Sequence, residues 1–131
     1  MISKVTGFSS QKRERRIYEV TISEQIDGNV AILALKGRLM GEPETSSLQE
    51  KKFQLLEANR TNIVLDLSGL TMVNSAGLGS MIAALVSTRD RGGDIRLARM
   101  SKSVEHVIGK VQLDSVFRIF KTVEDAVASF G

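Results

Sequence analysis

Hydrophobic and polar positions alternate along the first regular segment of the chain. The chain becomes regular at Ile17: Tyr18, Val20 and Ile22 alternate with polar residues, and a Gly-containing turn signal at 27–29 then precedes the apolar run Val30–Leu35. Alternation with a period of two is typical of a half-buried strand, and such a turn between two strand-like runs is typical of a hairpin. The pattern therefore predicts a β-hairpin whose second strand ends at Gly37.

Helix-like and strand-like segments alternate after this hairpin. Helices are expected from Pro43 to about Asn59 and from Ser75 to Arg91, the second stopped by a pair of glycines. The short apolar runs Asn62–Leu67 and Ile95–Ala98 are typical of buried strands. Apolar residues at helical spacing mark the faces that should be buried: Leu48, Phe53, Leu55 and Leu56 on the first helix, and Leu78, Ile82 and Leu85 on the second.

The last third of the chain continues the alternation. A third helix is expected from about Ser101, and Val116–Phe120 is expected to form a final short strand. Thr122 and Asp125 resemble a capping box that starts a last helix. The predicted apolar stripes are Val104, Val107, Ile108 and Val111 on the third helix, and Val123, Ala126, Val127 and Phe130 on the last. The element order ββαβαβαβα predicts an α/β fold, with a mostly parallel sheet after an opening hairpin, packed against helices.

Charge is distributed unevenly between the first residues and the remainder. The chain has 131 residues with 18 basic and 15 acidic side chains, which suits a single domain. Residues 1–17 hold five basic residues and one acidic residue, so 13 basic and 14 acidic residues remain elsewhere. Residues 1–16 are therefore expected to form a flexible basic arm before a domain at 17–131. Without interleaved aromatic residues, this arm does not predict direct nucleic-acid binding.

Composition excludes several classes of protein. The chain has no cysteine, which rules out a disulfide scaffold, a zinc–thiolate site and a cysteine nucleophile. Its longest apolar runs, such as Met81–Val86, are far shorter than the roughly 20 residues that span a bilayer. The first residues lack the apolar core of a secretory signal. A cytoplasmic protein without membrane contact is the expectation.

The most informative segment is Val64–Met81, with the sequence VLDLSGLTMVNSAGLGSM. After its apolar strand, Asn74 or Ser75 can cap a helix whose first turn contains Gly77 and Gly79. Backbone N–H groups at a helix start lack helical partners, and the helix dipole favours a negative group there. Three uses fit these residues: a capped helix packed closely on the sheet, a cradle for a phosphate or nucleotide, and a surface for a protein partner.

Two stretches of this segment match a known signature: Asp66-Leu67-Ser68 and, after a spacer, Asn74-Ser75-Ala76-Gly77-Leu78-Gly79. Together they resemble the signature loop of STAS domains in anti-sigma-factor antagonists, which is usually D-S-S-G-L-G or a near variant. Gly37-Arg38-Leu39, Gly92-Gly93 and the element order are similar as well. The resemblance extends over about Tyr18–Phe130 and implies a STAS-like fold.

What the resemblance implies about function centres on Ser75. In this family the matching serine is phosphorylated by a partner anti-sigma factor, which has serine kinase activity and an ATP-binding, histidine-kinase-like fold. The unphosphorylated antagonist sequesters that partner, and phosphorylation releases it. The resemblance thus implies a bacterial transcription regulator that is not an enzyme and needs no cofactor. Ser75 would be the phosphorylation site, and the partner-binding surface would comprise Asn74, Ala76, Gly77, Leu78 and Gly79.

Three residues differ from the usual family pattern. Asn74 replaces a common Asp, Met40 stands where many members have Asp after G-x-L, and Ala76 replaces a common second serine. The first two changes remove carboxylates near Ser75, and the third leaves Ser75 as the only hydroxyl of the motif. These changes bear on which partner is bound and on how efficiently Ser75 is phosphorylated.

Other functions remain open on the sequence alone. Within the family they are a stressosome-type scaffold and a STAS subunit of a lipid-transport complex, and a homodimer is open too. From another class, a flavodoxin-like protein would bind nucleotide or flavin at the Gly77 turn, although the motif lacks a third glycine and a P-loop lysine. A hydrolase using Ser75, His106 and Asp66 is disfavoured, because Ser75 lacks a G-x-S-x-G elbow. The single histidine is expected at the surface or at the boundary of the core, and no metal ligands are predicted.

Overall fold

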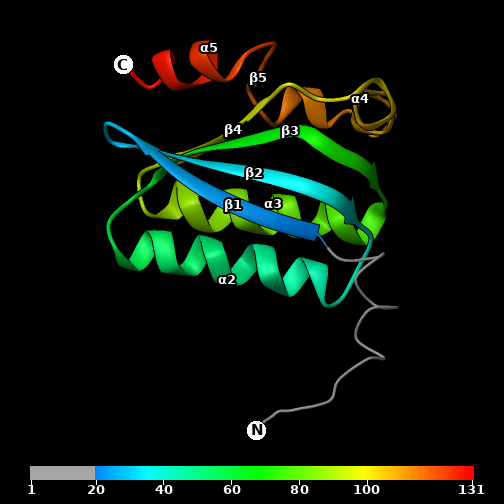
Figure 1. The fold of residues 1–131 in the computed structure, drawn as a ribbon, viewed down its shortest axis with the longest axis horizontal. Helices are drawn as coiled ribbons and strands as arrows, with labels where there is room; N and C mark the ends of the chain where they lie inside the picture. The colour runs from blue at the N-terminus through cyan, green and yellow to red at the C-terminus, as the bar shows by residue number, and fades with distance from the viewer. Residues whose placement is uncertain (1–19) are drawn as a thin grey trace, which may run out of the picture.

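The computed structural model describes residues 20–131 (Figure 1). The predicted basic arm and the first residues of the predicted first strand lie outside the described residues. The predicted order of strands and helices is confirmed, with one added 3₁₀ turn, η1. The elements are β1 Val20–Asp27, β2 Val30–Leu39, α2 Glu44–Glu57, β3 Asn62–Val73, α3 Ser75–Asp90, β4 Asp94–Ala98, α4 Lys102–Lys110, η1 Leu113–Ser115, β5 Ile119–Phe120 and α5 Val123–Ala128.

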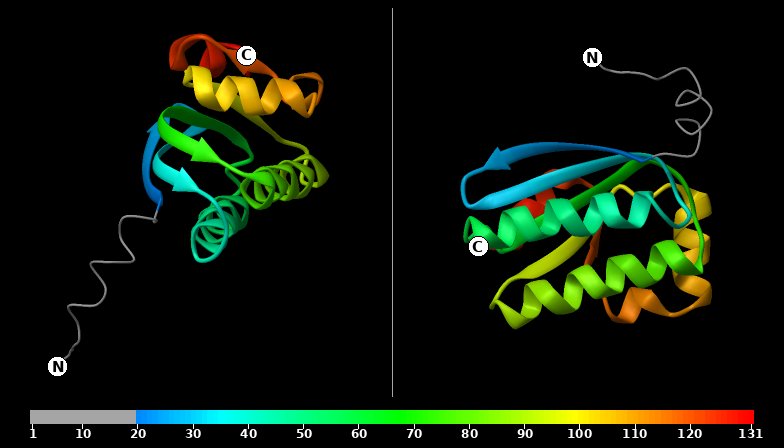
Figure 2. Two further views of the ribbon diagram at one scale, coloured as in Figure 1. Left: turned by 90° about the vertical axis from the view of Figure 1, so that its right-hand side faces the viewer. Right: turned by 90° about the horizontal axis from the view of Figure 1, so that it is seen from below.

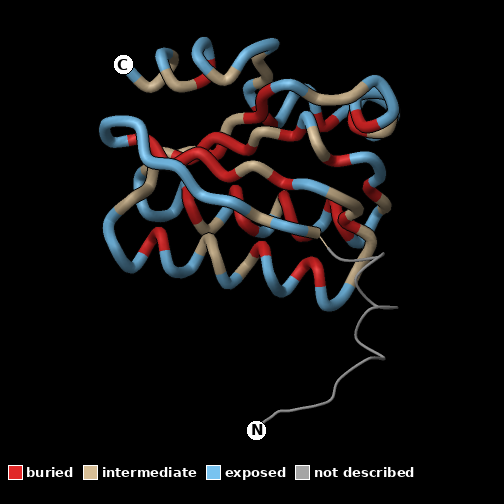
Figure 3. The backbone as a smooth tube through the Cα atoms, viewed as in Figure 1, coloured by how far each residue is buried: buried red, intermediate tan, exposed pale blue. Residues whose placement is uncertain are grey.

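The five strands form one mixed sheet in the order β1-β2-β3-β4-β5. β1 and β2 are antiparallel and the other pairs are parallel, which confirms the predicted hairpin and parallel sheet. Helices α2 and α3 cover one face of the sheet and α5 lies on the other (Figures 1 and 2). The larger core lies between the sheet and α2, α3 and α4, and a smaller one lies under α5, as the buried segments in Figure 3 indicate.

Local sequence signals locate most element ends correctly. Gly28 has a positive φ of 63° in the turn between β1 and β2. The hydroxyls of Ser101 and Thr122 accept hydrogen bonds from backbone N–H groups three residues later, at 3.3 and 3.0 Å, and so cap α4 and α5. These signals act within a few residues, which is why the pattern alone could find them.

Two predicted strand ends were wrong, because β2 continues past Gly37 to Leu39 and β3 continues past Leu67 to Val73. The parallel pairing of β2 with β3 slips twice in this stretch, so β3 carries bulges where a loop was expected. Its buried residues there are Leu67, Leu70 and Val73, three positions apart rather than two. Because of the bulges, this part of β3 lacks the alternation of apolar and polar residues by which a strand is predicted from sequence.

The long strands β2 and β3 project beyond β4 and β5, whereas β1 stays paired with β2 as far as Gly37. β4 pairs with β3 only as far as Asp66, whereas β2 pairs with β3 as far as Val73. α4 lies against this extension, and its N-cap Ser101 donates a hydrogen bond from Oγ to the Leu70 carbonyl at 3.3 Å. Helix α3 starts at the tip of this extension, where its first turn lies against the end of β2.

Three further expectations about packing were wrong. Phe53 was placed on the buried stripe of α2 but is 58% exposed, because it lies five residues after Leu48, about 140° around the helix. Val111 was placed on the buried stripe of α4 but is 52% exposed, since the helix ends at Lys110 and the chain turns through left-handed Gln112.

The third concerns the predicted strand Val116–Phe120. η1 occupies Leu113–Ser115, and β5 is only Ile119–Phe120. Phe117 is buried in the larger core instead of extending the strand.

Among the described residues, no helix has the length and apolar character needed to cross a membrane.

Candidate functional site at the start of helix α3

Asn74 fastens the start of α3 to the end of β2. Its side-chain Oδ1 accepts a hydrogen bond from the Gly77 N–H at 2.9 Å, so Asn74, and not Ser75, is the N-cap. Its Nδ2 donates to the Met40 carbonyl at 2.7 Å, and its backbone N–H donates to the Leu39 carbonyl at 3.3 Å. An amide is required for this double role, because a carboxylate could accept from Gly77 but could not donate to Met40.

Replacing Asn74 by alanine is expected to cost about 1–2 kcal/mol of stability, since both the cap and the tie to Met40 are lost. Asn74→Asp keeps the cap acceptor and adds a negative charge at the helix start, so it should cost less. Urea unfolding of the three proteins measures the difference. Equal losses in both variants would show that the bond to Met40, and not the cap, carries the effect.

Ser75 and Ala76 follow the cap at the exposed corner of this helix start. Within the described part of the chain, neither the Ser75 hydroxyl nor the backbone N–H groups of Ser75 and Ala76 have a hydrogen-bond partner. The first turn of α3 has no acidic residue to neutralise the dipole. The corner thus combines an open hydroxyl with a positive helix terminus.

The two glycines of the motif have different surroundings. A Cβ atom at Gly77 would stand 2.1 Å from the Leu39 carbonyl oxygen, so Gly77 is buried where α3 crosses β2. At Gly79 a Cβ atom would meet nothing within 4 Å, and this residue is exposed. The close packing of α3 on β2 therefore requires glycine at position 77. Gly79 instead leaves the surface beside Ser75 without a side chain.

An open groove of about 320 Å³ adjoins Ser75. Leu78 forms part of its floor and is itself only 5% exposed. None of the lining side chains is charged; they are Ser75, Leu78, Gly79, Ile82, Val111 and Leu113. Such a lining favours an apolar protein surface over the phosphates of a nucleotide.

The loop between β2 and α2 supplies a carboxylate at Glu42, two residues after Met40. Hydrogen bonds from the Ser46 and Thr45 hydroxyls, the latter at 2.8 Å, hold the pKa of Glu42 below its usual value. Glu42 is therefore ionised at neutral pH. Its carboxylate is bonded to side chains in the first turn of α2. It therefore does not replace the aspartate that many family members have at the position of Met40.

The residues of the disfavoured hydrolase do not form a hydrogen-bonded set. Asp66 accepts from the Ser68 backbone N–H at 3.1 Å and lies 3.6 Å from Arg99 Nη1 in an ion pair. His106 is exposed on α4, as expected, and in the described residues no hydrogen bond joins it to Ser75 or Asp66. Within that same part of the chain, no cluster of acidic or histidine side chains is arranged to hold a metal ion.

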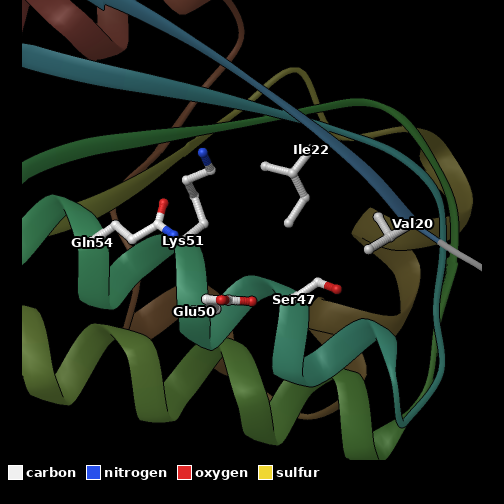
Figure 4. A pocket seen from close by; sticks show the side chains of 6 residues that line it. All are labelled: Val20, Ile22, Ser47, Glu50, Lys51 and Gln54. Carbon is white, nitrogen blue, oxygen red and sulfur yellow. The ribbon is translucent and has the colours of Figure 1, made fainter. Parts of the chain in front are cut away.

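A second hollow of about 340 Å³ opens between β1 and α2 (Figure 4). Val20 and Ile22 lie on its strand side, and the helix side carries polar residues. Lys51 in its wall pairs with Glu24 at 3.2 Å. This hollow contains neither a helix start nor an exposed unpaired hydroxyl of the kind found at Ser75.

The fold and the α3 corner define an α/β module with a mixed sheet and an open hydroxyl at a helix start. The family model for the STAS domain matches residues 18–126. The chain therefore belongs to the STAS domain family.

Solved structures agree with this fold. An anti-sigma factor antagonist from Mycobacterium paratuberculosis has a TM-score of 0.73 at 19% identity, over 85% of this chain and 93% of that one. The Bacillus cell fate determinant SpoIIAA, in its phosphorylated form, has a TM-score of 0.67 at 16% identity, over 85% and 100%. The murine anion transporter Slc26a9 contains a similar domain, with a TM-score of 0.65 at 18% identity, over 79% of this chain and 18% of that one. At such identities the likeness establishes the shared fold.

Proposed function

We propose that this protein is an anti-sigma factor antagonist whose binding to an anti-sigma factor kinase is switched by phosphorylation of Ser75. The observation that carries the proposal is the exposed, unpaired Ser75 hydroxyl at the first residue of α3, among the described residues. Two of the similar structures are of an anti-sigma factor antagonist and of a phosphorylated cell fate determinant. The chain would sequester the kinase when unphosphorylated and release it afterwards, and so regulate sigma-factor-dependent transcription.

The chemistry requires little from this chain. The γ-phosphoryl group of ATP passes to Ser75 Oγ, the hydroxyl proton leaves to a base, and ADP departs. The described surroundings of Ser75 offer no carboxylate or imidazole bonded to its hydroxyl, so the base belongs to the kinase. This chain is then the substrate, and it supplies position and exposure rather than catalysis.

The helix start favours the modified state of the isolated protein. A phosphate adds a charge of about −1.5 to −2, which the free N–H groups of Ser75 and Ala76 and the α3 dipole would stabilise. Gly79, with open space around it, leaves room for the added group. Phosphorylation is therefore expected to leave the fold intact and to act on the interface alone.

Phosphate incorporation tests the site directly. Incubation with the anti-sigma factor kinase of the same organism and ATP should add one phosphate to the wild-type chain and none to Ser75→Ala. Ser103→Ala is the matched control, because Ser103 is also an exposed serine in the first turn of a helix, α4. Mass spectrometry of the intact proteins and their peptides measures the result. Phosphate found only at other serines, or full incorporation into Ser75→Ala, would refute the proposal.

A further inference from the structure

A line of small and apolar residues runs from Ser75 along one side of α3. Ser75, Gly79, Ile82 and Val86 follow one another at intervals of four, three and four residues, which places them on one face of the helix. Ile82 is half-buried and Val86 is 54% exposed. The line extends over about 17 Å, or three helical turns.

The segment that follows α4 widens this line. Val111 and Leu113 line the groove that contains Ser75. Farther on, Arg89 Nη2 donates a hydrogen bond to the Val116 carbonyl at 3.0 Å, so the segment stays beside α3 one turn past Val86 (Figure 2). Val116 is 37% exposed. We call this surface the apolar strip; its residues are Ser75, Leu78, Gly79, Ile82, Val86, Val111, Leu113 and Val116.

Exposed hydrophobic side chains concentrate on this surface. The described residues include six large exposed hydrophobics, of which Val86, Val111 and Val116 lie on the strip. The remaining three are dispersed over β1, β3 and α2. A contiguous apolar surface of this kind marks a binding site more often than single exposed residues do.

We infer that the apolar strip binds an apolar helix face of the anti-sigma factor kinase. The inference rests on the proposed function, because the strip begins at the phosphate acceptor. A kinase must bring the γ-phosphate of ATP to Ser75 Oγ, so the surface that covers the adjoining groove belongs to the same kinase. The strip is as long as three turns of helix, which suits a helix laid into a groove.

The strip also explains how one phosphate acts on the whole interface. The groove beside Ser75 has no charged residue in its lining. When a partner covers this groove, a phosphate on Ser75 would be desolvated, and the groove lining offers no cation to pair with it. Binding of the partner would therefore become less favourable. The apolar contact that holds the kinase is thus the contact that phosphorylation makes unfavourable.

Aspartate substitutions on the strip test this inference. Val86→Asp and Val111→Asp each place a charge on the strip, and both side chains are more than half exposed, so the fold should persist. Phe53→Asp is the matched control, because Phe53 is equally exposed but lies on α2. The affinity of each chain for the purified kinase with ADP is measured by calorimetry. We expect a loss of at least tenfold for each strip variant and less than twofold for Phe53→Asp.

Strip variants that bind as tightly as Phe53→Asp would overturn the inference and leave the Ser75 proposal intact, since phosphate incorporation tests that separately. Light scattering tests whether the strip instead binds a second copy of this chain. A wild-type dimer that Val86→Asp converts to monomer, with kinase affinity unchanged, would also overturn the inference. A wild-type chain that binds no such kinase would overturn the proposed function, and this inference with it.

Discussion

Replacing Gly77 by alanine is expected to lower the free energy of unfolding by about 3 kcal/mol and the Tm by roughly 10 °C. The new Cβ would stand 2.1 Å from the Leu39 carbonyl oxygen and 2.8 Å from Val73 Cγ2. A rotamer change cannot relieve the first clash, because that oxygen belongs to the backbone of β2. The start of α3 must move away, which breaks the hydrogen bonds from Asn74 to Leu39 and Met40.

Gly79→Ala is the matched control for this prediction. Both positions lie in the first two turns of α3, and alanine favours a helix over glycine by up to about 1 kcal/mol. A Cβ at Gly79 meets nothing within 4 Å, so this variant should be more stable than wild type by about 0.5–1 kcal/mol. Thermal and urea unfolding measure both variants. Equal stability of the two would contradict the close approach of α3 to β2.

Ser75→Asp is expected to weaken kinase binding by about 100-fold, or roughly 3 kcal/mol, while leaving the Tm at or above the wild-type value. The carboxylate sits at the positive end of α3 in the free protein, where it is stabilised. In the complex it must be desolvated beside a groove without charged residues. Calorimetric titration of the kinase and thermal unfolding of the free protein measure the two effects.

Ser75→Asn separates charge from size, because asparagine has nearly the volume of aspartate but no charge. Its affinity should stay within about tenfold of wild type if charge is the cause. Equal weakening by Asp and Asn would show that the interface excludes any larger side chain, and would refute an electrostatic switch.

Local signals account for most of the fold that the sequence predicted. The Gly28 turn, the caps at Ser101 and Thr122 and the stripe of α3 each depend on residues only a few positions apart. Their geometry is nearly independent of what lies across the sheet. The order of elements and the parallel sheet followed from these signals and from general rules of connection.

The errors occurred where distant segments decide the conformation. Ser68–Met72 has little strand character of its own, yet it pairs with β2 because bulges let it follow the neighbouring strand. Val111 fits the helical period of α4 but is turned outward at the left-handed Gln112. Neither outcome follows from the periodicity of the segment concerned, because both depend on the partner against which it packs.

The candidate site divides in the same way. The motif from Asn74 to Gly79 singled out Ser75 as the residue of interest, since a cap, a hydroxyl and small residues are consecutive in the chain. The motif did not distinguish its glycines, and only the position of the Leu39 carbonyl separates buried Gly77 from exposed Gly79. The apolar strip unites α3 with residues 25 or more positions later, and only tertiary packing decides which of their side chains stay outside the core.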